Sequence, residues 1–149
     1  MAERANRELS NGVTTLLQES GLPLQFWGEA LAAFVHVCNR CPSASLQGTT
    51  PYELWFKCKP DVSHLRVWGC TAYVHVQKDK RGQLGSHMEK CVFIGYPDGY
   101  KGWKFYNPTT KKVIISERAE FDERYFPSKR NSVSSPDLNP IPEPLPQDV

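Results

Sequence analysis

Basic and aromatic side chains alternate along residues 100–106 of this 149-residue chain, in the order Tyr-Lys-Gly-Trp-Lys-Phe-Tyr. Successive side chains of a β-strand point to opposite faces, so a strand here is expected to turn Trp103 and Phe105 inward and Lys104 and Tyr106 outward. Outward lysines can bind a DNA or RNA phosphate backbone by charge, without reading sequence. The predicted contact residues are Lys78, Lys80, Arg81, Lys104, Lys111 and Lys112. Such lysines are also typical of a solvated sheet edge that discourages pairing with another strand.

The distribution of charge supports phosphate binding more than the total charge does. The formal net charge is +2, but residues 77–112 hold eight basic side chains against three acidic ones. A local excess of this kind attracts polyanions. No apolar run reaches the about 18–20 residues of a membrane span, and the polar N-terminus lacks the hydrophobic segment of a secretory signal. We therefore expect an intracellular protein, nuclear or cytoplasmic, with no membrane partner.

Cys38 and Cys41 form a Cys-x-x-Cys pair, which has the spacing of half a zinc site. A structural zinc ion needs four ligands, usually including a second such pair, and the histidines of this chain are scattered. We therefore predict no metal site and interpret the cysteines as small buried side chains. Five cysteines, an odd number, also argue against a disulfide framework. The chain has neither the order of a Ser-His-Asp triad nor a glycine-rich phosphate loop.

Residues 1–61 have the periodicity of helices. Apolar residues recur at helical spacing from Leu9 to Leu17, and Gly21-Leu22-Pro23 is a helix-ending sequence. Thr50 and Glu53 predict a capping box around Pro51 at the start of a short third helix. A second helix is predicted between these two, with one apolar face made by Trp27, Leu31, Phe34, Val35 and Cys38. So few helices bury little apolar surface on their own, so we expect them to dock on another surface.

From Leu65 the apolar period changes to two, and turn residues recur about every eight to twelve residues. This pattern is typical of a small all-β barrel of four or five strands, which we place at residues 62–127. Gly69 is expected at a bulge, because the apolar residues on its two sides differ in phase. The barrel is expected to fold without the helices, since it has its own apolar set: Val67, Val74, Val92, Ile94, Phe105, Ile114 and Phe121.

Residues 128–149 differ in composition from the rest. Prolines alternate with other residues in PIPEPLP, and no aromatic residue follows Pro127. Such a segment favours extended polyproline II and buries too little apolar surface to fold. We therefore predict an α+β architecture in three parts: helices at residues 1–61, a β-barrel at 62–127 and a disordered tail at 128–149.

Three stretches of the chain resemble the copia-type LTR retrotransposon polyprotein. AERANRELSNGVTTLLQESGLPLQFWGEALAAFVHVCNRCPS resembles the last helices of its RNase H-like integrase core. TTPYELWFKCKPDVSHLRVWGCTAYVHV resembles the join to the next domain, and HMEKCVFIGYPDGYKGWKFYNPTTKKVIISERAEFDE resembles the SH3-like domain downstream. Their order and spacing make the resemblance specific, and it implies that the predicted barrel is SH3-like.

The resemblance also implies a role for Glu3. In A-E-R-x-N-R, Glu3 stands where the family has the third acid of its D,D-E catalytic triad. That triad holds two divalent ions, Mg or Mn, for in-line attack on phosphate. In the family both aspartates precede this glutamate, and the sequence given starts two residues before it. We expect no catalysis and no cofactor in this chain alone, with Glu3 an inactive remnant that favours the helix N-terminus.

The expected function is therefore that of an integrase fragment. Its SH3-like domain is expected to associate weakly with DNA or RNA, without sequence preference, or to help assemble the integrase through its core or through self-association. The alternative is a protein-interaction module that binds polypeptide through the barrel or the exposed helices. Salt dependence separates the two, because phosphate binding weakens steeply with salt and an apolar contact does not.

Overall fold

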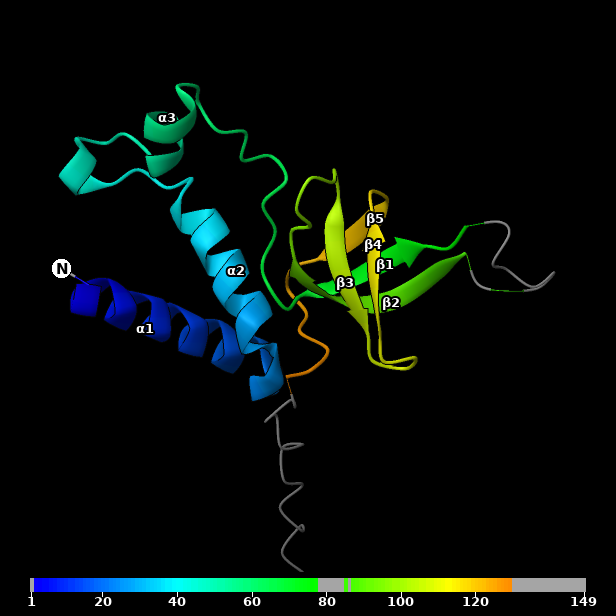
Figure 1. Cartoon of the computed structure of the whole chain (residues 1–149). Helices are drawn as coiled ribbons and strands as arrows, with labels where there is room; N and C mark the ends of the chain where they lie inside the picture. The colour runs from blue at the N-terminus through cyan, green and yellow to red at the C-terminus, as the bar shows by residue number, and fades with distance from the viewer. Residues whose placement is uncertain (1, 78–84, 86, 130–149) are drawn as a thin grey trace, which may run out of the picture.

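The structure is a computed structural model that describes residues 2–77, 85 and 87–129. In these residues three α-helices precede a five-stranded antiparallel sheet, which confirms the predicted α+β architecture (Figure 1). The predicted tail lies outside the described residues from residue 130 onward. No helix in the described ranges is long and apolar enough to cross a membrane.

The helices are α1 (Ala2–Ser20), α2 (Trp27–Cys38) and α3 (Pro51–Phe56), and two single 3₁₀ turns lie between them, at Leu24–Phe26 and Ala44–Leu46. Helix α1 ends at Gly21, which has the left-handed φ of 71° and whose N–H donates to the Leu17 carbonyl at 3.0 Å. The capping box at α3 is present as predicted, with Thr50 Oγ1 accepting from Glu53 N at 3.1 Å. Local sequence signals therefore set both boundaries.

Helix α2 has two apolar faces, whereas the sequence predicted one. Ala30 and Ala33 are buried on the side of the sheet, where they pack in one cluster with Val92 and Ile94. The other side faces α1, where a Cβ atom at Gly12 would lie only 2.3 Å from the Phe34 ring. The predicted face was therefore partly wrong, because α2 is packed between α1 and the sheet and its smallest side chains occupy the tightest contact.

The strands are β1 (Thr71–His75), β2 (Met88–Gly95), β3 (Trp103–Asn107), β4 (Lys112–Ser116) and β5 (Ala119–Asp122), in the sheet order β4-β3-β2-β1-β5. The sheet curls strongly. Strands β3 and β5 are three positions apart, about 14 Å in a flat sheet, yet the rings of Phe105 and Phe121 lie 5.7 Å apart. Such curling encloses a core on the concave side, as an SH3-like fold requires.

The sheet has a core on each face. Phe93 and Phe105 are fully buried on the concave side, with Val74, Ile114 and Phe121 in the same cluster. Val92 and Ile94 were also predicted for the barrel interior but pack on the opposite face, against the helices. Val67 is 44% exposed, so its predicted place in the core was wrong.

The structure differs from the sequence-based prediction in two further details of the strands. Gly69 lies in a turn before β1, with φ of 82°, rather than at a bulge within a strand. Tyr106, predicted to point to solvent, packs edge-on against Phe26 with ring centroids 4.9 Å apart. The outer face of β3 is covered by the helical part, which the pattern of a single strand does not reveal.

Candidate nucleic-acid interface

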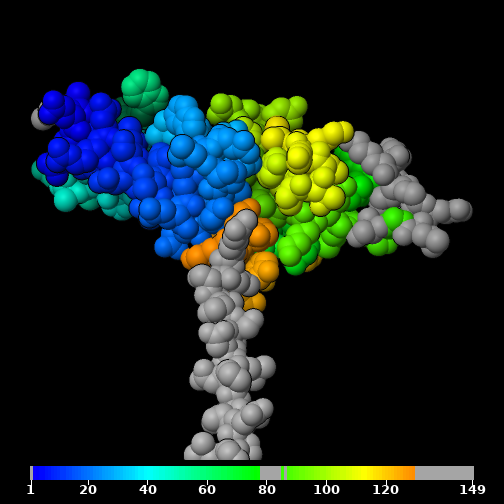
Figure 2. All heavy atoms as spheres, turned by 90° about the horizontal axis from the view of Figure 1, so that it is seen from below, coloured from blue at the N-terminus to red at the C-terminus, as the bar shows by residue number. Residues whose placement is uncertain are grey.

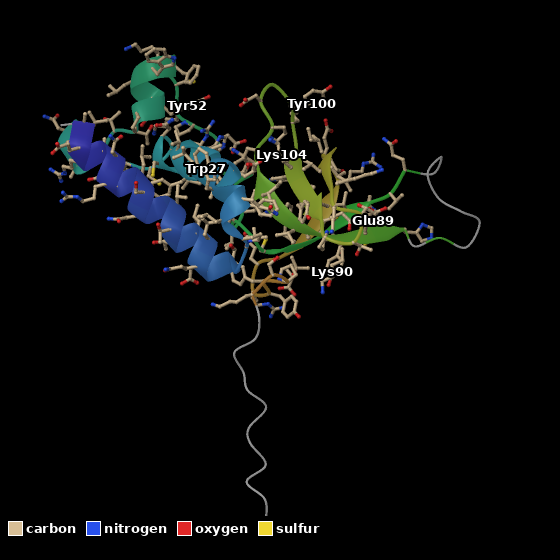
Figure 3. The ribbon with its side chains drawn as sticks, turned by 60° about the horizontal axis from the view of Figure 1, so that its bottom comes forward. Trp27, Tyr52, Glu89, Lys90, Tyr100 and Lys104 are labelled. Carbon is tan, nitrogen blue, oxygen red and sulfur yellow. The ribbon has the colours of Figure 1, made fainter. Side chains whose placement is uncertain are left out.

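The register of β3 and β4 separates the lysines that the sequence grouped together. Lys104 pairs with Ile115 and Lys112 pairs with Asn107. Directly opposed residues share a face and successive pairs alternate, so Lys104 and Lys112 lie on opposite faces, near opposite ends of the hairpin. Figure 3 shows Lys104 on the side of the sheet near α2. Lys111 precedes Lys112 in the chain, and both are exposed.

The turn that presents Lys111 and Lys112 is held by Asn107, which is 5% exposed. Its side-chain oxygen accepts from the N–H groups of Thr109 and Thr110 at 2.9 and 3.3 Å. Its side-chain nitrogen donates to a Glu89 carboxylate oxygen on β2 at 2.9 Å. These bonds fix the turn in place, and Lys111 adopts the left-handed φ of 56° within it.

The connection between β1 and β2 begins and ends at the edge of the sheet toward which this turn points. It starts after His75 and returns at Met88, which are paired across the two strands. Tyr106 pairs with Val92 in the middle of β2, so the antiparallel β3 ends pointing toward the Met88 end of β2. The predicted contacts Lys78, Lys80 and Arg81 belong to this connection and lie outside the described residues. We call this region the lysine-turn end, defined by His75, Met88, Lys111 and Lys112.

Arg118 is a cation near the lysine-turn end that the sequence did not single out. It is exposed, and its carbonyl accepts from the N–H of His75 at 3.2 Å. The nearby acids Glu117 and Glu120 offset its charge along the chain, so a count of charges by segment did not reveal it. Lys90 was also left out of the predicted contacts, and its ammonium lies 5.0 Å from the centre of the Tyr125 ring.

Glu3, the predicted remnant of a triad, lies in the first turn of α1 with an exposed side chain. In residues 2–77, 85 and 87–129, no group of three or more His, Cys, Asp or Glu side chains is placed to hold a metal ion.

The cysteines divide into two groups. Cys70 and Cys91 are fully buried in the sheet, and burial raises the pKa of their thiols to about 12 and about 11. Cys38, Cys41 and Cys58 are exposed, so the prediction that they are buried was wrong. Helix α2 ends at Cys38, and the chain beyond it runs over the surface rather than back into the core.

A cleft that the sequence did not predict lies between the C-terminal end of α2 and the turn before β3. It has a volume of about 590 Å³, and its walls include His36, Arg40, Tyr52, Tyr96, Tyr100 and Trp103. Tyr100 is 71% exposed, and Figure 3 shows it on the turn beside β3. No periodic pattern marks these residues, because they come from α2 and the residues just after it, from α3, from the loop between β2 and β3, and from β3.

The centre of this cleft is a histidine pair. The Nε2 atoms of His36 and His64 lie 2.8 Å apart, and the His36 ring stacks on Tyr96 with centroids 4.1 Å apart. Burial, helped by the nearby Arg40 and His64 and opposed by Asp98, lowers the pKa of His36 to about 4. Burial also lowers the pKa of His64, with Arg40 and Arg66 acting in the same direction and Asp61 against them. Both imidazoles are therefore neutral at pH 7.

The sheet belongs to a recognised class of domain: residues 70–135 match the family model of the retroviral polymerase SH3-like domain. Over 123 residues, 83% of its length, the chain is 39% identical to the retrovirus-related Pol polyprotein from transposon TNT 1-94 of Nicotiana tabacum. Over 127 residues, 85% of its length, it is 31% identical to the corresponding polyprotein from transposon RE1 of Arabidopsis thaliana. This chain is thus a homologue of one segment of retrotransposon Pol polyproteins.

The chain spans 9% of the length of each of these two polyproteins. It is also 39% identical over 75 residues to an uncharacterized mitochondrial protein of Arabidopsis thaliana, with 50% of this chain and 62% of that protein covered. No solved structure matches the chain.

Proposed function

We propose that this chain is a nucleic-acid-associating segment of a retrotransposon integrase region, and that it carries no strand-transfer chemistry of its own. The observation that supports it best is the lysine-turn end, where Lys111 and Lys112 are both exposed and the turn that carries them points toward the Met88 end of β2. These two adjacent exposed lysines can contact phosphates of a nucleic-acid backbone.

The chemistry of this surface fits non-specific binding. Lysine acts as a point charge toward phosphate and reads no base edge. Glu89, the acid beside the turn, is engaged by Asn107 rather than pointed freely at a ligand. A handful of contacts corresponds to dissociation constants of about 10⁻⁴–10⁻⁶ M at physiological salt, with little preference among sequences.

Salt titration tests this proposal. The full chain is titrated with a labelled duplex of about 20 base pairs, and with a single strand of equal length, between about 20 and 200 mM salt. The logarithm of the binding constant should fall linearly with the logarithm of salt, by about 0.9 per phosphate contact on the duplex and about 0.7 on the single strand. The K104Q/K111Q/K112Q variant should bind more weakly and with a smaller slope.

The matched control is R7Q/K57Q/K59Q, which also removes three positive charges but from the helical part. It should bind as the wild type does. Absence of binding at low salt would overturn the proposal, as would a K104Q/K111Q/K112Q variant that binds like the control.

A second candidate function is assembly, with the integrase core or a second copy as partner. The α1–α2 hairpin leaves a hollow of about 390 Å³ whose walls include Leu9, Val13, Trp27 and Leu31. Trp27 is 57% exposed, which is unusual for a tryptophan and is typical of a surface that binds a partner. Sedimentation of the full chain should show association that grows with concentration and resists salt. Trp27→Ser should reduce this association, and a strictly monomeric wild-type chain would contradict the candidate.

A further inference from the structure

Two hollows on the helical side of the molecule are neighbours, because they share lining residues. The first, of about 500 Å³, lies on α3 and is lined by Asn39, Arg40, Pro51, Tyr52, Trp55 and Phe56. The second is the histidine cleft, which shares Arg40 and Tyr52 with the first. We call the combined surface the aromatic groove, and its rings come from Tyr52, Trp55, Phe56, Tyr100 and Trp103.

Some rings of the aromatic groove are exposed, and others are held by contacts with their neighbours. Trp55 is 81% exposed and Phe56 58%. The Tyr52 ring contacts Phe56 with centroids 4.5 Å apart, and the Arg40 guanidinium lies 4.8 Å from the centre of the Tyr52 ring. At the other end, Trp103 Nε1 donates to the His64 carbonyl at 2.9 Å. A ligand here therefore meets the rings of Tyr52 and Trp103 already positioned, which lowers the entropy cost of binding.

We propose that the aromatic groove binds the proline-rich segment of the chain's own tail, residues 140–146, with the sequence PIPEPLP. Polyproline II segments dock in grooves lined by aromatic side chains, because the pyrrolidine rings pack flat on them and the segment is already extended. Charge does not decide the occupant, because Arg40 and Lys101 in the groove are balanced by Asp61 and Glu117.

The tail is long enough to reach the groove. The last described residue, Lys129, lies against the turn after α1, since a Cβ atom at Gly21 would be 2.5 Å from the Lys129 Cα. Helix α2 runs from near that turn to the groove, and its 12 residues span about 18 Å. The eleven residues from Lys129 to Pro140 cover about 34 Å in polyproline II. Figure 2 shows the last described residues, in orange, next to the start of α2.

Fluorine NMR of the full chain with 5-fluorotryptophan tests this assignment. The chain has four tryptophans, and each resonance is identified by a Trp→Phe substitution. The P140A/P142A/P144A/P146A variant should shift the Trp55 resonance and leave that of Trp27 unchanged, because Trp27 is also exposed but lies outside the groove. Pro136→Ala, which changes a tail proline outside the segment, should shift neither resonance. Substitutions in the tail leave both cores untouched, so unfolding does not confuse the result.

Addition in trans completes the test. A peptide of residues 137–149, added to the quadruple variant, should restore the wild-type Trp55 resonance with half-saturation below about 1 mM, since tethering by a short linker supplies effective concentrations of that order. An unchanged Trp55 resonance in the quadruple variant overturns the proposal. So does a wild-type shift that disappears on dilution, which assigns the segment to a second copy. If a dT12 oligonucleotide shifts Trp55 and the peptide does not, the groove is a single-strand site instead.

Discussion

The Nε2 atoms of His36 and His64 approach to 2.8 Å, and this contact joins α2 to the chain that leads into the sheet. One ring must donate and the other accept, so at least one of the two must be neutral. The stack of His36 on Tyr96 and the bond from Arg66 N to the Tyr96 hydroxyl, at 3.1 Å, extend the contact to the end of β2. The helices and the sheet are therefore joined by a polar cluster as well as by a shared apolar core.

We predict that acid loosens this junction. The pKa values of both histidines are lowered in the folded chain, His36 from 6.5 to about 4, so the unfolded chain binds more protons. Their contribution to stability is complete above pH 6.5 and is lost as the pH falls from 6.5 toward 4. Because both rings are partly exposed, we expect the free energy of unfolding to fall by only on the order of 1–2 kcal/mol between pH 7 and pH 5. Urea unfolding at these two pH values measures the difference.

His36→Gln should remove most of this pH dependence between pH 7 and pH 5 and lower stability at pH 7. His75→Gln is the matched control, because His75 is exposed at the end of β1, and it should keep the wild-type profile. If His36→Gln and wild type lose stability in parallel, the histidine pair is not the source.

Glycine substitutions test the contact between α1 and the sheet. Gly69 and Gly48 share the left-handed φ of 82°. A Cβ atom at Gly69 would lie 2.3 Å from the Ser20 Cβ, whereas nothing lies within 4 Å at Gly48. Gly48→Ala should therefore lower the free energy of unfolding by about 1–2 kcal/mol, because alanine is strained at this backbone φ. Gly69→Ala should lower it by about 2 kcal/mol more, because its Cβ atom also meets Ser20. Equal costs in thermal unfolding would mean that α1 does not press on this turn.

A stabilising substitution is predicted at Thr71. Its side chain is fully buried in β1, and its hydroxyl is the one buried side-chain oxygen or nitrogen without a hydrogen-bond partner in the described ranges. Thr71→Val keeps the shape and removes the unpaired hydroxyl, so we expect about 1 kcal/mol of added stability. Thr50→Val, which removes the cap of α3, should destabilise by about 1 kcal/mol. Chemical denaturation of both variants checks the contrast in sign.

The sequence was most informative where one residue type meets one local requirement. The Gly21 end of α1 and the capping box of α3 follow from backbone bonds within a few residues. The faces of α2 and β3 did not follow, since each element is packed on two sides and periodicity assumes a single buried face. For that reason Ala30 is buried in the core and Tyr106 packs against it.

The candidate site shows the same limit. Charge counting found Lys111 and Lys112, but the pairing register decides that Lys104 faces the other way. The aromatic groove could not be predicted from the sequence, because its side chains come from positions between residue 36 and residue 117 and most of them belong to no local motif. Long-range packing, rather than local propensity, brings them together.

The salt dependence of two variants tests the central claim most directly, because the register assigns their lysines to opposite faces. In duplex titrations of the full chain, K111Q/K112Q should lower the slope of the binding constant against salt by about 1.8, or about 0.9 per lost contact. K104Q, which removes a half-buried lysine beside α2, should change the slope by less than half of the value expected for one phosphate contact. A slope that falls for K104Q and stays at the wild-type value for K111Q/K112Q would contradict the assignment of phosphate binding to the lysine-turn end.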